Sequence, residues 1–507
     1  MGARIAGLAL LALLAAATLI IAPWSSAASS DGRPNIVMII TDDQTLSEMA
    51  GLPQTRNLIG GAGVTFSRFY ISYPLCCPSR ATFLTGRYSH NHGVHGNTPP
   101  NGGAGVFNDA QTVPVWLHNS GYKTVHIGKY LNGYALTSGP FVPPGWDEWY
   151  GKLGRTNGVA SENHYFDYSM YEQGPTGLPQ LINYGEAQSD YQTDIYRDKA
   201  VDAINRLSGP GASQPFYLSL DFGAPHFPYT PAPRHEGALT GVPLPKLAAF
   251  NERNLRDKPK FMRVGTRGIP QKTRRRIANR RRLRLEQLLS VDEAISSVFD
   301  ALTRTGELSN TYVLFASDNG YFNGEHRVYK GKYLPQEPSS HVPMMMRGPG
   351  LPAGATSAEL SANVDIAPTI IAAAGPAAQA QVPAGFVDGR SLLPFAANPA
   401  ATTQRPVLLE ADRGTLEGDE PTGDTEVQPA SLSSLRGVPN LEQEPFAHMT
   451  KTSHNSLTSV SAPAYRAIRT NRYLFVQYAS GAQELYDMLR DPAQVHSVNA
   501  TPAYRAV

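Results

Sequence analysis

The sequence predicts an α/β protein built on a large mixed, mostly parallel β-sheet that is flanked by helices. Two kinds of pattern support this fold class. Short apolar runs rich in β-branched residues, such as residues 34–41 and 311–317, have the composition of strands buried on both faces of a parallel sheet. Between such runs, apolar residues recur at helical spacing over residues 283–304 and 365–374.

Four of the predicted strands end in side chains that can do chemistry. In open α/β sheets, ligands bind beyond the carboxyl ends of the strands. We therefore expect carboxylates, an amide, an imidazole and an ammonium group to meet at one edge of the sheet. The four segments are residues 34–41, followed by Asp42-Asp43-Gln44; 311–317, followed by Asp318-Asn319-Gly320; 215–221, leading to Ala224-Pro225-His226; and 123–127, leading to Gly128-Lys129.

The rest of the chain divides into loops and a smaller C-terminal part. Segments rich in Gly, Pro, Asn and Tyr have the composition of loops that shape a binding site. Residues 465–470 and 473–478 have the pattern of a strand pair. We expect a main domain over residues 33–395 and a smaller subdomain over 396–507. The predicted loops are residues 93–113, 134–190 and 228–270, and a long polar loop at 411–461 within the subdomain.

The N-terminus has the pattern of an export signal. Arg4 precedes an almost wholly apolar stretch at residues 5–22, and small residues follow at 25–30. We expect residues 1–28 to be a signal peptide cleaved near Ala27 or Ala28; an uncleaved membrane anchor is the alternative. The protein would then be secreted or associated with the cell envelope, without a membrane span after cleavage. The Ala-, Gly- and Pro-rich composition suggests a bacterial source.

Composition excludes little else. The net charge is +2, with 41% hydrophobic and 17% charged residues, so the chain resembles an ordinary globular protein and gives no indication of a nucleic-acid partner.

The only two cysteines among 507 residues are the neighbours Cys76 and Cys77. Adjacent Cα atoms lie about 3.8 Å apart, which disfavours a disulfide, and two thiols cannot supply a four-ligand zinc site. A buried, inert pair is unattractive because Pro78-Ser79-Arg80 follows, and arginine is rarely buried without a partner.

The order C-x-P-S-R-x-x-x-L-T-G-R over residues 76–87 resembles the signature of the type I sulfatases. The resemblance covers most of residues 34–395 and 465–499. It implies an alkaline-phosphatase-like fold with a small C-terminal antiparallel sheet packed by a helix. It also implies that Cys76 is oxidised to Cα-formylglycine, an aldehyde, by a dedicated formylglycine-generating maturation enzyme before folding closes over it.

The vicinal carboxylates Asp42 and Asp43, with Asp318 and Asn319, make an all-oxygen set of the kind that hard divalent cations prefer, whereas zinc would favour imidazole or thiolate. In the resembled family these positions, together with the oxygen carried by the converted Cys76, hold Ca²⁺. Mg²⁺ is the alternative ion.

The resemblance also implies which cations surround the sulfate. They are Arg80, Lys129, His226 and Lys332, with Lys330 a competitor for the last position. Many members of the family place a histidine two residues after the first lysine, but this chain has Leu131, which cannot transfer protons. His92 is the first candidate to replace it. The alternatives are His90, His95, His126 and His326.

Three further segments, at residues 128–132, 289–293 and 317–321, are similar to the N-acetylglucosamine-6-sulfatase branch. The expected activity is therefore hydrolysis of a sulfate monoester on a sugar, such as a 6-sulfated N-acetylglucosamine or a related sulfated glycan. One alternative keeps the fold but cleaves phosphate or phosphonate monoesters. An alternative of another class is a catalytically silent protein that binds sulfated glycans.

The arginine run at residues 274–284 is the one local charge anomaly. A solvated helix face is the first interpretation. A landing surface for a sulfated polysaccharide is the second, and a nucleic-acid contact is the third, without any recognition motif to support it.

Overall fold

The computed structural model describes residues 32–135, 139–153, 165–208, 212–263, 268–412 and 462–504, and the backbone of four short strands between them. These strands are β6 (Arg155–Thr156), β7 (Val159–Ala160), β16 (Lys451–Ser453) and β17 (Ser456–Thr458). The signal peptide predicted at 1–28 and most of the polar loop predicted at 411–461 lie outside the described residues. Among the described residues, no helix is both long and apolar enough to cross a bilayer.

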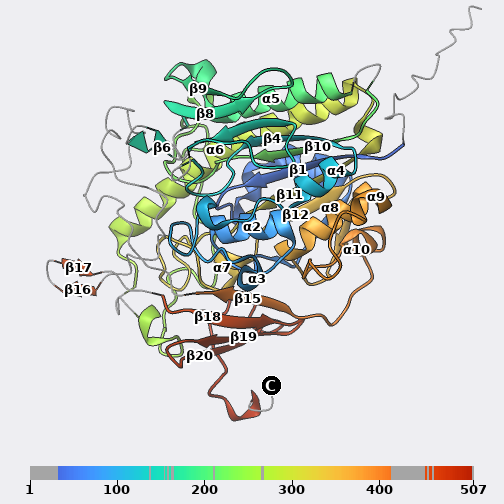
Figure 1. Cartoon of the computed structure of the whole chain (residues 1–507). Helices are drawn as coiled ribbons and strands as arrows, with labels where there is room; N and C mark the ends of the chain where they lie inside the picture. Colours follow the sequence, from blue (N-terminus) through green and yellow to red (C-terminus); the bar gives the residue numbers. More distant parts are fainter. Residues whose placement is uncertain are drawn as a thin grey trace, which may run out of the picture.

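A ten-stranded sheet forms the centre of the molecule (Figure 1). Its order is β13-β2-β12-β11-β1-β10-β4-β5-β8-β9, and the five strands from β11 to β5 are mutually parallel. The bounds are β1 Asn35–Thr41, β2 Val64–Phe66, β4 Lys123–Gly128, β5 Glu148–Lys152, β8 Tyr168–Gln173, β9 Gln180–Tyr184, β10 Phe216–Asp221, β11 Thr311–Ser317, β12 Met344–Arg347 and β13 Ala355–Ser357. The mostly parallel sheet is thus confirmed, and all four predicted strands lie next to one another in it.

Strand register explains why the site forms where it does. Thr41 at the end of β1 pairs with Ser317 at the end of β11, and Asp221 at the end of β10 pairs with Gly128 at the end of β4. Because these strands are parallel and end level with one another, the residues that follow them meet at one edge of the sheet.

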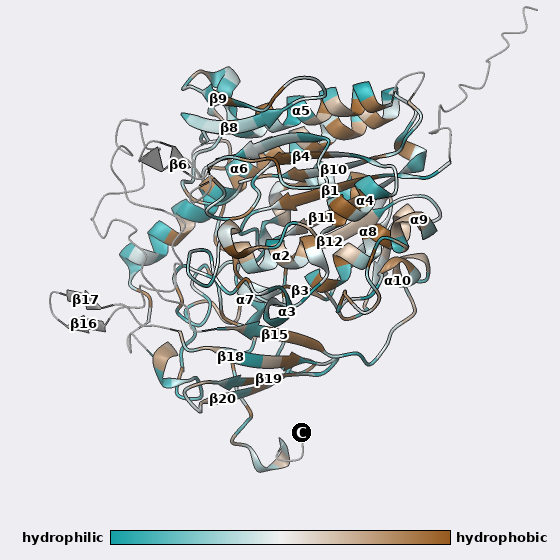
Figure 2. Ribbon diagram, viewed as in Figure 1, coloured by the Kyte–Doolittle hydropathy of each residue, from teal (hydrophilic) through white to brown (hydrophobic). Residues whose placement is uncertain are grey.

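Helices cover both faces of this sheet, as the sequence predicts. Along β1, Ile36, Met38 and Ile40 face one core, and Val37 and Ile39 face the other. Figure 2 shows much of the central strands in the brown of hydrophobic residues, which is the pattern of a sheet buried on both sides. The first core is closed by α2 (Cys76–Thr85), α4 (Val113–Asn119), α8 (Ile366–Ala374), α9 (Pro376–Gln379) and α10 (Leu393–Ala397); the second is closed by α1 (Pro53–Thr55), α5 (Gln192–Leu207) and α6 (Gln271–Arg304).

The loop predicted at 134–190 is wrong in part, because three strands of the main sheet and the short pair β6 and β7 lie within it. β5, β8 and β9 continue the main sheet beyond β4. The aromatic residues of Glu148–Lys152 and Tyr168–Gln173, which suggested a loop, instead pack on the pleated surface of the sheet, where aromatic side chains are favoured.

The C-terminal part forms a separate four-stranded antiparallel sheet in the order β15-β18-β19-β20. The predicted strand pair is confirmed as β18 (Tyr465–Arg469) and β19 (Tyr473–Tyr478), and β15 (Val407–Ala411) and β20 (Gln483–Asp487) extend it. Among residues 462–504 the helical segment is the single 3₁₀ turn Pro502–Tyr504. Smaller elements near the site are β3 (Phe69–Tyr70), β14 (Ser361–Ala362), α3 (Ser89–His92) and α7 (Glu337–Ser340).

Candidate active site

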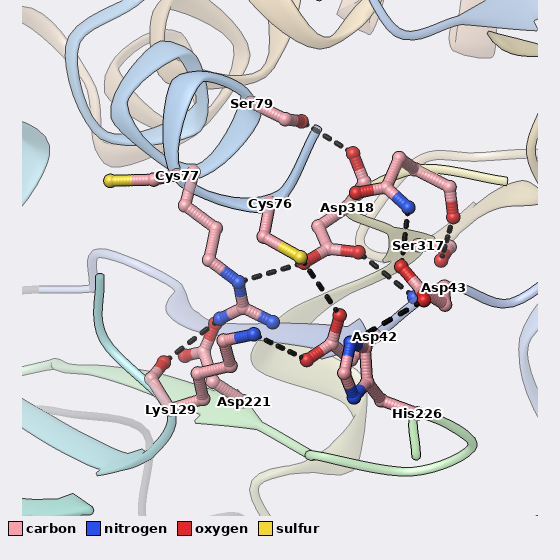
Figure 3. A network of polar contacts seen from close by, with 12 residues as sticks. Asp42, Asp43, Cys76, Cys77, Ser79, Lys129, Asp221, His226, Ser317 and Asp318 are labelled. Atoms are coloured by element: carbon pink, nitrogen blue, oxygen red, sulfur yellow. Dashed lines mark hydrogen bonds and ion pairs between the residues drawn. The ribbon is translucent and has the colours of Figure 1, made fainter. Parts of the chain in front are cut away.

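Polar side chains from four strand ends and from the first turn of α2 converge at the carboxyl edge of the sheet (Figure 3). Cys76 is the first residue of α2, and the preceding residue, Leu75, is extended, so the helix starts at the motif itself. Helix α2 ends at Gly86, whose φ of 68° is the left-handed conformation that glycine adopts without strain. The motif thus forms a short buried helix that points its N-terminus at the strand ends.

Asp42, Asp43, Asp318 and Asn319 lie together, as the sequence predicts. The backbone N–H of Asp43 donates to Asp318 Oδ1 at 3.1 Å, and Asn319 Nδ2 donates to Asp43 Oδ1 at 2.6 Å. All four side chains are at most 2% exposed. Asp43 has a φ of 66°, which is unusual for a residue other than glycine and turns its carboxylate into the cluster.

Two observations indicate that this cluster suits a divalent cation. Four buried carboxylates, those of Asp42, Asp43, Asp221 and Asp318, lie close together and face the buried Arg80, Lys129 and Lys332 and the His226 ring. Burial and the neighbouring Asp42 charge raise the pKa of Asp318 to about 6, despite Arg80. Asn319 Oδ1 is buried and has no hydrogen-bond partner within the described chain, although buried amide oxygens are normally satisfied. A hard, oxygen-preferring cation would compensate the charge of the buried carboxylates and would bind the Asn319 Oδ1 atom.

The ligand-bearing atoms of Asp42, Asp43, Cys76 and His226 all lie within 4.8 Å of one another. That mixed set could also suggest zinc, which binds thiolate, imidazole and carboxylate groups. However, burial and the Asp42 charge raise the pKa of the Cys76 thiol well above its usual value, outweighing the lysines nearby. Burial thus favours the protonated thiol at Cys76, and the oxygens of Asp42, Asp43, Asp318 and Asn319 form the set that a hard cation prefers.

Cys76 is 1% exposed and lies between a cation and a carboxylate. Lys332 Nζ is 2.6 Å from Cys76 Sγ, and Asp42 Oδ1 is 3.4 Å from it. The Cys77 side chain points away from this cluster (Figure 3) and packs in the apolar core. As a thiol with a raised pKa, Cys76 is a poor nucleophile, so the position needs a different chemical group to be reactive.

Arg80 lies one helical turn after Cys76 and is held by two carboxylates. Its Nε donates to Asp318 Oδ2 at 2.8 Å, and its Nη1 donates to Asp221 Oδ1 at 3.2 Å and to the Lys129 carbonyl at 2.8 Å. Its Nη2 is buried and has no partner within the described chain. One rigidly held N–H group is thus left for a bound anion.

Asp221 was not predicted as a site residue. Burial is the main cause that raises its pKa to about 6, although Arg80 opposes the shift. The only signal in the sequence was its position at the end of a predicted strand, where a charged residue is out of keeping with an apolar run.

Lys129, Lys332 and His226 join the same cluster. Lys129 Nζ donates to Asp42 Oδ2 at 2.7 Å, and Lys332 Nζ pairs with Asp43 Oδ1. Burial would raise the pKa of Asp42, but Lys129, His226 and Arg80 together hold it well below its usual value. His226 Nδ1 donates to the Phe227 carbonyl at 2.8 Å, so its Nε2 faces the site, 3.6 Å from Asp43 Oδ2.

His92, the predicted proton-handling base, lies outside the group of ligand-bearing side chains around Cys76 and is held by other contacts. His92 Nε2 lies 3.1 Å from Thr82 Oγ1, whose own hydroxyl donates to the Pro78 carbonyl. Nδ1 accepts from the backbone N–H of Val94 at 3.1 Å. These contacts fit a neutral ring with the proton on Nε2. Burial and the nearby His95 and Arg87 lower the pKa of His92 to about 3, which also favours the neutral form.

The alternative histidines are engaged elsewhere. His90 pairs with Glu410, His95 with Asp412, and His326 with Glu252. His126 is buried in β4 and stacks on Trp149, with ring centroids 4.3 Å apart. Of the histidines considered from the sequence, His226 is the one placed in the Cys76 cluster.

The neutral state of His92 predicts a specific pH dependence of stability. The pKa is about 3 in the folded chain against 6.5 for the free side chain, so the unfolded state takes up the proton first as pH falls. We expect wild type to lose about 1–2 kcal/mol relative to His92→Gln between pH 7.5 and 5. Urea unfolding of both proteins at the two pH values measures this loss, and a pH-independent difference would contradict the neutral assignment.

The arginine run is only partly a solvated face. Arg274, Arg275 and Arg276 are exposed, whereas Arg280, Arg281 and Arg284 are buried within α6. Arg280 donates to the Tyr329 carbonyl and lies over the Tyr321 ring. The whole arginine run therefore cannot form one surface for a polysaccharide, because three of its arginines are buried in the protein.

This geometry fits one class of hydrolase, and comparison with known proteins agrees. The family model Sulfatase matches residues 34–376. The chain belongs to the sulfatase family. It is 34% identical over 392 residues to a putative extracellular sulfatase Sulf-1 homolog of Caenorhabditis elegans, covering 76% of this chain and 52% of that protein. It is also 34% identical over 401 residues to the N-acetylglucosamine-6-sulfatase of Capra hircus, covering 77% and 68%.

A solved structure of a protein in complex with its substrate D-glucosamine-2-N,6-O-disulfate superimposes with a TM-score of 0.68 and 25% identity. The match covers 94% of this chain and 95% of that one. The fold is therefore that of the sulfatases throughout. The chain spans about half of the length of the Caenorhabditis relative, so that relative contains regions with no counterpart in the match.

Proposed function

We propose that this protein hydrolyses sulfate monoesters on a glycan such as a 6-sulfated N-acetylglucosamine. The observation that carries the proposal is the position of Cys76 at the start of the sulfatase motif, buried and in contact with Lys332 and Asp42. Family membership and the glycan sulfatases among the relatives support it.

Cys76 would be converted to Cα-formylglycine by a maturation enzyme, and Asp42, Asp43, Asp318 and Asn319 would hold Ca²⁺, with Mg²⁺ as the alternative. The hydrated aldehyde would carry two hydroxyl groups. One would attack sulfur, and the other would lose its proton so that sulfate leaves and the aldehyde is restored. The place of Cys76 at the first position of the motif, in contact with Lys332 and Asp42, supports this conversion. The metal supplies positive charge that activates the attacking group and compensates the buried carboxylates.

The residues of this chain have separable roles in the proposed reaction. Arg80 Nη2, Lys129 and Lys332 surround the position of the sulfate oxygens and stabilise charge that develops on them. His226 Nε2 is oriented by the bond from Nδ1 to the Phe227 carbonyl, and it would give a proton to the leaving sugar oxygen. The cations are fixed by their carboxylate partners before substrate arrives, so little reorganisation is needed at the moment of reaction.

The protein would act outside the cell. The N-terminal segment at 1–28 supports export from a bacterium, and the extracellular sulfatases among the relatives are consistent with it. The catalytic domain would comprise residues 33–395, and residues 396–507 would form the smaller subdomain around the β15-β18-β19-β20 sheet.

A substrate panel tests the proposal. The purified protein should release sulfate from N-acetylglucosamine 6-sulfate and from a small aryl sulfate, and should turn over the matched phosphate monoesters more slowly. The rate of the Cys76→Ala variant measures background hydrolysis, and it is subtracted from each wild-type rate. Faster release of phosphate than of sulfate would favour the phosphoesterase alternative. Binding of sulfated glycan without any release would favour the silent alternative.

A further inference from the structure

Arg284 is a fully buried arginine that the proposed reaction does not use. It lies on α6, in the same run as exposed arginines, yet it is 0% exposed. Its partner Glu48, on the 3₁₀ turn Leu46–Gly51, is also 0% exposed. Arg284 Nε donates to Glu48 Oε1 at 2.6 Å, and Nη2 donates to Glu48 Oε2 at 2.7 Å.

The same guanidinium also contacts the segments that build the active site. Nη2 donates to the Asp43 carbonyl at 2.6 Å, and Nη1 donates to the Pro225 carbonyl, immediately before His226, at 3.3 Å. The Arg284 guanidinium lies 4.9 Å from the centroid of the Tyr321 ring, two residues after Asn319. One side chain therefore contacts three of the strand-end segments that carry the proposed metal and leaving-group residues.

The backbone at Asp43 requires such support. Its φ of 66° is a left-handed conformation that costs a non-glycine residue about 1 kcal/mol or more and persists only where the surroundings hold it. Glu48 reinforces the turn, because its Oε2 also accepts from the Thr45 backbone N–H at 2.9 Å. Arg284 and Glu48 thus close a network around the turn that directs the Asp43 carboxylate.

A buried ion pair is a weak source of stability, because desolvation cancels most of the attraction. A planar group with five donors is, however, well suited to fix several acceptors at once. The neighbouring Arg282 is different: it is half-buried and pairs with Glu286 one helical turn away on its own helix.

We propose that Arg284, braced by Glu48, is a positioning residue that fixes the Asp43 turn and the His226 loop in the geometry the metal site requires. The inference rests on the metal site proposed above. Residues that orient metal ligands typically change metal affinity or activity by about 10- to 100-fold when they are replaced.

Three variants and one control test this role. Calcium titration calorimetry, kcat, KM and melting temperature are measured for wild type, Arg284→Met, Arg284→Lys and the double variant Arg284→Met with Glu48→Leu. Arg282→Met is the control and should match wild type in calcium affinity and kcat. Arg284→Met should melt at a lower temperature, because it leaves the Glu48 charge buried and unpaired.

The double variant separates positioning from stability. Removing both charges should raise the melting temperature above that of Arg284→Met, while calcium binding stays at least about 10-fold weaker than in wild type and kcat stays reduced. Arg284→Lys keeps a positive charge for Glu48, but one ammonium group cannot reach all the acceptors that the guanidinium contacts. This variant should therefore fold, and it should bind calcium about 10-fold more weakly than wild type. Wild-type calcium affinity and kcat in either protein would overturn the inference.

Calcium binding is measured without substrate, so this result does not depend on which ester is hydrolysed. If wild type itself bound no calcium, the calcium assignment would fall. The kcat of Arg284→Lys against wild type would then decide the positioning role, with an unchanged value overturning it.

Discussion

Replacing Cys76 with alanine is expected to abolish sulfate-ester hydrolysis and leave the fold intact. The side chain contacts Lys332 and Asp42, and it lies in the same group of side chains as Asp43 and His226. Alanine is smaller than cysteine and compatible with a helix start, so circular dichroism and melting temperature should stay close to wild type. Sulfate release at saturating substrate measures the loss.

Cys77 provides the matched control. It is the next residue on the same helix, but its side chain lies in the apolar core and away from the cluster (Figure 3). Cys77→Ala should keep most of the activity and lose only some stability. Cys76→Ser should stall after the first half of the reaction with sulfate on the serine, because serine lacks a second hydroxyl. Loss of activity in Cys77→Ala with activity retained in Cys76→Ala would reverse the assignment.

Neutralising any one of the cluster carboxylates is expected to reduce activity by orders of magnitude. Asp42→Asn, Asp43→Asn and Asp318→Asn each remove a negative charge and an oxygen donor from the proposed cation site. Each change also unbalances a buried cation: Lys129 loses Asp42, Lys332 loses Asp43, and Arg80 loses Asp318. Metal content and kcat of each variant, measured together, check the effect.

Asp202→Asn is the matched carboxylate control, because Asp202 is exposed and pairs with Arg206 on its own helix. It should leave activity and metal content unchanged. Chelation of wild type should inhibit, and calcium or magnesium should restore activity. An active enzyme that contains zinc on histidine ligands, or that is indifferent to chelators, would contradict the oxygen site.

Much of this arrangement follows from the sequence because the signals are local. Apolar runs that end in Asp42-Asp43 and Asp318-Asn319 define parallel strands and the edge where they meet, and parallel register then brings the two pairs together. The motif at Cys76 is contiguous, so its helix and its cations could be predicted residue by residue. Lys332 also joins the cluster, while its competitor Lys330 is only half-buried.

The features that were missed depend on long-range packing. His92 is close to the motif in sequence, but Thr82 and Val94 hold it on the far part of α2 and its following turn. Asp221 and Arg284 are charged residues in otherwise ordinary strand and helix patterns, and only their burial reveals a role. Strands β5, β8 and β9 are marked by aromatic residues rather than by aliphatic runs, and composition alone did not separate them from a loop.

The central claim is that the reactive group at residue 76 is no longer a thiol. Mass spectrometry of the peptide containing residues 76 and 77, from protein produced with the maturation enzyme, tests it most directly. Replacement of the thiol by a carbonyl oxygen lowers the mass by about 18 Da and creates an electrophile. The account predicts this loss at Cys76, with Cys77 still open to alkylation after unfolding. An active enzyme in which both thiols of this peptide are intact would contradict it.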